Sequence, residues 1–324
     1  MHDPKYFQQL VDVELERIQF SDRPAELYDP IRYMLNLGGK RMRPALLLMA
    51  NEMFGGETGS AIGPALGIEV FHNFTLLHDD IMDKAPLRRS QPTVHVKWNP
   101  DIAILSGDTM FVKACQLMMQ TDNSCLRTIM NDFLQTSMEV CEGQKLDMNF
   151  ERQEKVTIAD YVDMIALKTA VLLGSSLRIG ATIGGASAED ASSLYDFGKQ
   201  LGIAFQLHDD VLDAYGDPIK FGKQEGGDII ANKKTYLLLT AMESEDRVAV
   251  AELKRWMTLV EFNPSEKVSA IKEIFEKIGV RNKAEEELDR FFSRSLRSLD
   301  SIPLAEERKA PLRRLAERLM VRES

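Results

Sequence analysis

The sequence lacks the features of a disulfide framework, a zinc site or a nucleic-acid-binding protein. Its 324 residues include only three cysteines, Cys115, Cys125 and Cys141, without the close pairing of zinc ligands. We therefore expect free thiols in the core and a reducing compartment. Acidic residues outnumber basic ones by 50 to 40, and the formal charge of -10 opposes binding to nucleic acid or anionic lipid.

Targeting signals and long apolar runs are also scarce. The N-terminus carries early acidic residues and no apolar stretch before a small-residue cleavage site, so we expect a cytoplasmic protein. The nearest approach to a membrane span is residues 169–185, but Lys168 precedes this segment and Arg178 interrupts it. Its many small residues predict a tightly packed, buried helix and no membrane span.

Strand-like alternation is nearly absent, whereas apolar residues recur every three or four positions along the chain. The pattern predicts an all-α fold. Thr157 and Asp160 form a capping-box pattern before an apolar run, which places Lys168 and Thr169 inside a helix. Because no low-complexity linker or shift in composition divides the chain, we expect one helical domain over residues 1–324.

One motif occurs twice, as LHDDIMD at residues 77–83 and as LHDDVLD at residues 207–213. Each copy ends a strongly apolar helical run, which indicates two central helices. Residues four apart lie on one face of a helix, so Asp79 and Asp83 can point the same way, as can Asp209 and Asp213. We expect the histidines that precede the acids, His78 and His208, to face sideways as structural groups.

Carboxylates at a helix C-terminus repel each other and are also repelled by the negative end of the helix dipole. A divalent cation would therefore stabilise them. Ligands that are all oxygen favour Mg²⁺, which keeps waters and binds substrate phosphates. The predicted metal ligands are Asp79, Asp80, Asp83, Asp209, Asp210 and Asp213. The alternative is a solvated helix end or a structural salt-bridge cluster, but the apolar flanks of two copies favour the metal site.

Basic residues cluster near glycines and near both motifs. Residues 38–44, GGKRMRP, place three cations and two glycines before an apolar helix, an arrangement that can cradle a diphosphate. Exposed charges beside an ordinary helix cap are the alternative. Arg88 and Arg89 could hold diphosphate oxygens bidentately. The glycine-rich loop after the second motif could close over a site, and it supplies Lys223, Lys233 and Lys234.

Taken together, GGKRMRP, LLHDDIMD, LRRSQPTVHVKW, Lys168-Thr169, FQLHDDVLD and FGK resemble the trans-prenyltransferases, the isoprenyl diphosphate synthases. The resemblance covers about residues 30–240. It implies a single-domain helical bundle around a deep central cavity, with the aspartate motifs facing each other across the mouth. It also implies a homodimer and Mg²⁺, with three ions when substrate is bound.

The resemblance assigns roles to individual residues. The aspartates would hold Mg²⁺ on an allylic diphosphate, with Asp210 and Asp213 in supporting positions. The cations expected on the same diphosphate are Arg88, Lys168, Lys223 and Lys233. Those expected on isopentenyl diphosphate are Lys40, Arg43, His72 and Arg89. Thr169 and Gln206 would face the developing cation. Asn232 replaces a glycine of the family pattern, which leaves the choice between Lys233 and Lys234 open.

The implied reaction is the head-to-tail condensation of isopentenyl diphosphate with dimethylallyl, geranyl or farnesyl diphosphate. A class I terpene cyclase is disfavoured because its second metal motif normally mixes Asn, Ser or Thr with Glu, whereas residues 209–213 read DDVLD. A non-catalytic subunit of a heteromeric synthase generally lacks one intact motif, and this chain has both. A long-chain synthase of the same family differs only in product length.

The resemblance implies that product length depends on the residues that precede the first motif. Phe74 lies five residues before Asp79, about 7 to 8 Å along the helix, where its ring could form the floor of a prenyl pocket. Phe71, one turn below, could form a second floor, and Thr75 is small enough to leave room. By resemblance this pattern favours geranylgeranyl diphosphate (C20), with farnesyl diphosphate (C15) as the alternative. Phe74 could also be a core aromatic alone.

Overall fold

The computed structural model describes residues 2–216 and 226–320, and it is 77% helical, which confirms the predicted all-α fold. Among the described residues the only strands are β1 (Leu87–Arg88) and β2 (Gln91–Pro92), which pair antiparallel. The chain divides into two compact units, and each is described separately below. The expectation of a single domain over residues 1–324 stays a prediction.

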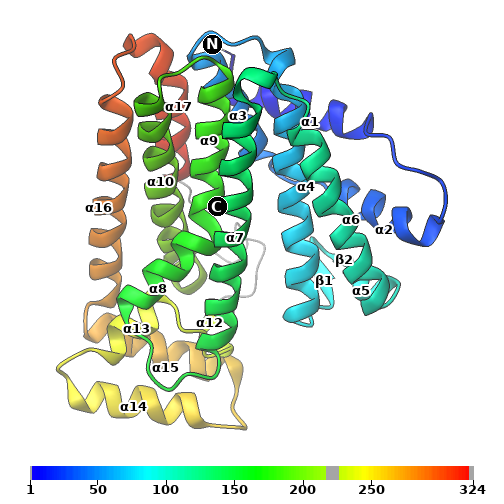
Figure 1. The fold of residues 1–324 in the computed structure, drawn as a ribbon. Coiled ribbons are helices and arrows are strands. Elements are labelled where there is room, and N and C mark those ends of the chain that lie inside the picture. Colours follow the sequence, from blue (N-terminus) through cyan, green and yellow to red (C-terminus); the bar gives the residue numbers. More distant parts are fainter. Residues whose placement is uncertain (1, 217–225, 321–324) are drawn as a thin grey trace. The chain divides into compact units, whose positions relative to one another are not determined.

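Unit 1 comprises residues Met1–Leu134, Ser175–Leu194 and Leu304–Leu312. Its complete helices are α1 (Pro4–Glu16), α2 (Ala25–Asn36), α3 (Met42–Met53), α4 (Thr58–Met82), α5 (Val94–Lys97) and α6 (Pro100–Met118) (Figure 1). It also contains parts of α7 (Asn123–Phe150), α9 (Val171–Ile183), α10 (Ala188–Tyr215) and α17 (Glu306–Met320).

Helix α4 is the centre of unit 1 and packs chiefly against α6 and α3. It is buried around most of its circumference, as its almost continuous apolar sequence predicts. Two glycines allow α4 and α6 to approach closely. A Cβ atom on Gly67 would lie 2.8 Å from Sδ of Met118, and one on Gly107 would collide with the ring of His78. His78 therefore packs against α6 as a structural group, as predicted.

Unit 2 comprises residues Gln135–Gly174, Tyr195–Pro303 and Arg313–Ser324. Besides the remaining parts of the shared helices it contains α8 (Ile158–Ile165), η1 (Ala166–Ala170), α12 (Gly227–Ile230), α13 (Tyr236–Met242), α14 (Arg247–Thr258), α15 (Pro264–Lys277) and α16 (Val280–Asp300). Apolar side chains of α8, α10, α13, α15 and α16 form its core. The predicted capping box is confirmed, because Thr157 Oγ1 accepts the Asp160 N–H at 3.1 Å and the Asp160 carboxylate accepts the Thr157 N–H at 2.9 Å.

The predicted buried helix is also confirmed. The continuous helical stretch Ile158–Ile183 is apolar and long enough to cross a membrane by composition, but 78% of its apolar window is buried, as in the core helix of a soluble protein. The expectation of core thiols is wrong. Cys115 and Cys125 are half-buried and Cys141 is exposed, because Cys141 lies on the same solvent-exposed face of α7 as Met138 and Lys145.

Candidate active site

The first aspartate motif ends α4. Asp80 is buried, with 3% of its surface exposed, whereas Asp79 is half-buried and Asp83, the residue that ends the helix, is exposed. The Asp83 N–H donates to the Asp79 carbonyl at 2.9 Å, so the motif stays helical to its last residue. Asp79 and Asp83 are therefore one turn apart on one face, as the spacing predicts.

A tight hairpin turns Arg88 back toward this motif. Arg89 and Ser90 connect β1 to β2 with φ angles of 52° and 62°, the left-handed conformation that suits a two-residue hairpin loop. Arg88 then donates from Nε and from Nη2 to the two carboxylate oxygens of Asp80, each at 2.8 Å. A predicted metal ligand and a predicted diphosphate contact thus form a bidentate ion pair with each other.

Three of the four residues predicted to bind isopentenyl diphosphate come together beside α4. Arg43 Nη1 lies 3.0 Å from Nε2 of His72. The guanidinium of Arg89 lies against Gly39, where a Cβ atom would be 3.0 Å from Nη2, so glycine is required for this approach. Arg43 Nε is buried and has no hydrogen-bond partner among the described residues. Lys40 is exposed on the same loop, and its carbonyl accepts from Gln8 Nε2 at 2.7 Å.

This cluster keeps His72 neutral. Burial and the positive charges of Arg43, Arg89, Arg88 and Arg41 hold the pKa of His72 well below 6.5. Because an arginine can only donate, His72 Nε2 accepts from Arg43, and Nδ1 carries the ring proton. Burial also lowers the pKa of Arg43 to about 10, against the opposing charge of Glu69, so this guanidinium remains cationic at neutral pH.

The predicted floor residues belong to a cluster of four aromatic rings. Phe74 lies 5.6 Å from the ring centres of both Phe71 and Phe111, and Phe71 lies 5.3 Å from Phe133. Phe111 comes from α6 and Phe133 from α7, so their sequence positions gave no signal of this contact. The Thr75 hydroxyl donates to the carbonyl of His72 at 2.8 Å, within its own helix.

The second aspartate motif lies in α10 of unit 2. Asp210 is buried, with 4% of its surface exposed, and accepts a hydrogen bond from Tyr161 Oη at 2.5 Å. Burial raises the pKa of Asp210 to about 7, and the Asp228 charge adds to this shift, while the Tyr161 hydrogen bond and Lys233 oppose it. Asp213 accepts the Asp228 N–H at 3.0 Å. Sequence reasoning missed Tyr161 and Asp228.

Two of the predicted lysines lie among these carboxylates. Lys168 forms an ion pair with Asp147 at 2.5 Å, and Lys233 Nζ lies 3.7 Å from Asp228. Burial opposes the charge of Lys233, but the surrounding carboxylates, Asp228 foremost, raise its pKa. Lys234 instead donates to backbone carbonyls of residues 150 and 153. Lys223 lies outside the described residues, and Thr169 and Gln206 are half-buried on η1 and α10.

A buried lysine holds the segment that carries Lys233. Lys267 of α15 is fully buried and donates to the Ile230 carbonyl at 3.1 Å and to Asn232 Oδ1 at 2.8 Å. Asn232 adopts a φ of 53° and donates to the Met257 carbonyl at 3.0 Å. Asn232, which replaces the glycine of the family pattern, therefore adopts a left-handed conformation that asparagine tolerates.

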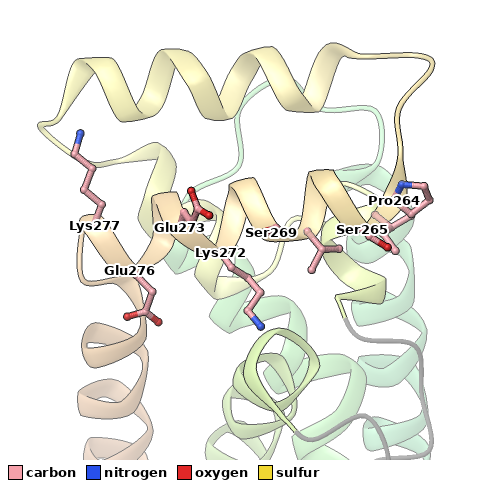
Figure 2. Close-up of a pocket in the computed structure, with 9 residues that line it drawn as sticks. Pro264, Ser265, Ser269, Lys272, Glu273, Glu276 and Lys277 are labelled. Atoms are coloured by element: carbon pink, nitrogen blue, oxygen red, sulfur yellow. The ribbon is translucent and has the colours of Figure 1, made fainter.

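Within residues 2–216 and 226–320, no three His, Cys, Asp or Glu side chains converge closely enough to hold a metal ion as they stand. A groove of about 940 Å³ runs along α15 and holds none of the predicted site residues. Figure 2 shows its lining side chains, which include Ser269, Lys272 and Glu273. The residues predicted from the sequence to carry the chemistry lie outside this groove, and their roles stay a prediction.

An all-helical fold with an aspartate-rich motif on α4 and another on α10 is the fold of an isoprenoid synthase. The family model for polyprenyl synthetase matches residues 24–278, so the chain belongs to this family. A geranylgeranyl diphosphate synthase of Methanosarcina mazei is 43% identical over 235 residues, 72% of each chain. A geranylfarnesyl diphosphate synthase of Natronomonas pharaonis is 38% identical, over 68% of this chain and 70% of its own. The crystal structure of a geranylgeranyl pyrophosphate synthase matches over 100% of both chains, with 42% identity and a TM-score of 0.95.

Proposed function

We propose that the chain joins isopentenyl diphosphate to allylic prenyl diphosphates and that its main product is geranylgeranyl diphosphate. The proposal rests on family membership and on the names of the relatives. The observation that carries it is the cationic cluster beside the first motif, where a buried Arg43 Nε without a partner adjoins neutral His72 and Arg89. Such a cluster suits a diphosphate close to a carboxylate-rich helix end.

The donors of both motifs suit Mg²⁺, because the predicted ligands offer only carboxylate oxygens. Asp79, Asp80 and Asp83 of α4 and Asp209, Asp210 and Asp213 of α10 would hold ions, with three ions in the substrate complex. When bound, Mg²⁺ would neutralise the charge that develops on departing pyrophosphate. Arg88 would exchange Asp80 for phosphate oxygens, and this exchange would free the Asp80 carboxylate for an ion.

The remaining residues would orient the two substrates. Lys40, Arg43, His72 and Arg89 would hold isopentenyl diphosphate, and Lys168, Lys223 and Lys233 the allylic diphosphate. The allylic C–O bond breaks as pyrophosphate leaves, the isopentenyl double bond forms the new C–C bond, and the isopentenyl unit loses a proton, which the departed pyrophosphate would accept. Thr169 and Gln206 would face the cation. The contacts of Lys234 with backbone carbonyls support Lys233 as the diphosphate ligand.

Product length would be set at the aromatic cluster. The ring of Phe74, backed by Phe71, would stop the prenyl tail, while Thr75 would leave space beside it. This supports C20. The geranylfarnesyl synthase among the relatives has a C25 product name at 38% identity, so family membership alone leaves farnesyl and longer products as alternatives.

The test is an assay of purified protein with Mg²⁺, labelled isopentenyl diphosphate and each allylic primer in turn, followed by chromatographic sizing of the products. The proposal predicts incorporation of isopentenyl units up to C20. A terpene cyclase would release pyrophosphate from a prenyl diphosphate without consuming isopentenyl diphosphate. A non-catalytic subunit would give no turnover alone, so either result would reject the proposal.

The proposed assembly is a homodimer, and the proposed location is the cytoplasm. Along α6 and its end, Leu105, Val112 and Met119 recur every seven residues and are 57–58% exposed, a row that a second copy could cover. Light scattering should give twice the monomer mass, and Val112→Lys should shift the protein toward monomer. A monomeric wild-type protein would reject the dimer, and cell fractionation tests the location.

A further inference from the structure

Arg41 differs from the other cations of residues 38–44 in its backbone and in its burial. It precedes the first turn of α3 with φ 45° and ψ 37°, a left-handed conformation that is uncommon for a residue with a long side chain. Only 5% of its surface is exposed, whereas its neighbour Lys40 is exposed. Such a conformation persists where surrounding contacts hold it.

The contacts that hold Arg41 use all three nitrogens of its guanidinium. Nη1 donates to Glu69 Oε1 at 2.6 Å, Nε donates to Asp12 Oδ1 at 2.8 Å, and Nη2 donates to the Leu35 carbonyl at 3.0 Å. The Glu69 side chain is 4% exposed and also accepts from Asn73 Nδ2 at 3.0 Å. The Asp12 side chain is 55% exposed, so its ion pair with Arg41 is weakened by solvent.

The Arg41–Glu69 ion pair joins the two segments that carry the cationic cluster. Arg41 ends the loop that leads into α3, two residues before Arg43 in the first turn of that helix, and Glu69 is three residues before His72 on α4. The ion pair therefore fixes the distance across which Arg43 reaches His72. Glu69 also acts as a counter-charge that raises the pKa of Arg43 and of Arg89 against the effect of burial.

We propose that Arg41 and Glu69 are positioning residues for isopentenyl diphosphate, which hold Lys40, Arg43 and His72 in place without contacting the substrate. The inference rests on the proposed assignment of this cluster to isopentenyl diphosphate. It follows from geometry, because Arg41 is only 5% exposed and each of its guanidinium nitrogens donates to a protein oxygen. A purely structural role would lower stability without distinguishing between the two substrates.

The experiment compares Arg41→Met, Arg41→Lys and Glu69→Gln with Asp12→Asn, which removes only the charge of the exposed ion pair of the same arginine. We expect Arg41→Met to raise KM for isopentenyl diphosphate about tenfold or more, with kcat and the allylic KM changed less than about threefold. Arg41→Lys keeps the charge but not the three-way contact, so its KM should fall between those of wild type and Arg41→Met. Asp12→Asn should stay within about twofold of wild type.

The inference is overturned if Arg41→Met lowers the melting temperature but leaves KM for isopentenyl diphosphate unchanged, or if both KM values rise equally. Glu69→Gln keeps the shape of the side chain and an acceptor oxygen but removes the negative charge. If Arg41→Met does not fold, the two KM values are compared in Glu69→Gln instead. Arg43→Ala tests the assignment of the cluster to isopentenyl diphosphate separately from the positioning role of Arg41 and Glu69. If Arg43→Ala leaves the isopentenyl KM unchanged, the assignment of the pocket is wrong. If only Arg43→Ala raises it, the positioning role is wrong.

Discussion

Replacement of Phe74 by alanine should lengthen the product. The exchange removes a six-carbon ring, and one isoprenoid unit contains five carbons, so the space released accommodates about one further unit. Phe74 touches Phe71 and Phe111 but is only half-buried, which leaves part of its ring free to meet a prenyl tail. We therefore expect the main product to shift from C20 to C25.

A second ring limits this shift. Phe71 is 1% exposed and lies beneath Phe74, in contact with Phe133. The double variant Phe74→Ala/Phe71→Ala should extend products to C30 or beyond. Removal of a buried phenylalanine costs about 3 to 5 kcal/mol of the free energy of unfolding, so the double variant must be assayed well below its melting temperature.

The assay is chromatographic sizing of dephosphorylated products with a fixed ratio of farnesyl to isopentenyl diphosphate. Phe20→Ala is the matched control, because Phe20 is also half-buried but its ring packs on that of Tyr28. Its products should match those of the wild type. Unchanged product length in both the single and the double variant would refute the reasoning and would indicate that the floor lies on another helix, with Phe111 as the next residue to test.

Three further predictions concern the charged residues. Asp79→Asn or Asp209→Asn should lower turnover by about a thousandfold or more, because each variant loses a predicted anionic metal ligand. The circular dichroism spectrum should stay unchanged, and near-wild-type rates would contradict the role of both motifs. Arg43→Ala should chiefly raise KM for isopentenyl diphosphate and Lys168→Ala that for the allylic substrate, and the reverse pattern in steady-state kinetics would overturn this division. The pKa of His72 lies below 6.5 in the folded state, so the unfolded chain binds this proton more readily, and the stability that neutral His72 contributes is lost as pH falls below about 6.5. Urea unfolding between pH 5 and 8 should therefore depend less on pH in His72→Gln, and an identical dependence would show that His72 is not the group responsible.

Local patterns in the sequence were sufficient for some features and insufficient for others. The capping box at Thr157 and the helical aspartate motifs were predicted because each depends on residues within one or two turns. The pairing of Arg88 with Asp80 was not predicted, because it depends on a hairpin loop whose left-handed residues, Arg89 and Ser90, are not the glycine or asparagine typical of such loops.

Contacts between distant segments were the least predictable. Phe111 and Phe133 contact Phe74 and Phe71 only because α6 and α7 pack against α4 in unit 1. Sequence analysis grouped Arg41 with the other two cations of residues 38–44, and its burial depends on Glu69, which is 28 positions away in the chain. A run of three cations therefore contains two kinds of residue, and only tertiary structure separates them.

The residues proposed to recognise charge and those proposed to control product length lie on different faces of helix α4, and this separation is itself testable. At about 100° per residue, Glu69, His72, Asp80 and Asp83 fall within about 80° of one another around the helix. Phe71 and Phe74 fall on another side, which meets Phe111 of α6. Because the two faces are separated by the width of the helix, a cavity opened on the aromatic face should leave the Arg43–His72 contact intact. We therefore expect Phe74→Ala to change KM for isopentenyl diphosphate less than about twofold while its products lengthen. A rise in that KM as large as the one caused by Arg43→Ala would mean that the two faces of α4 are coupled.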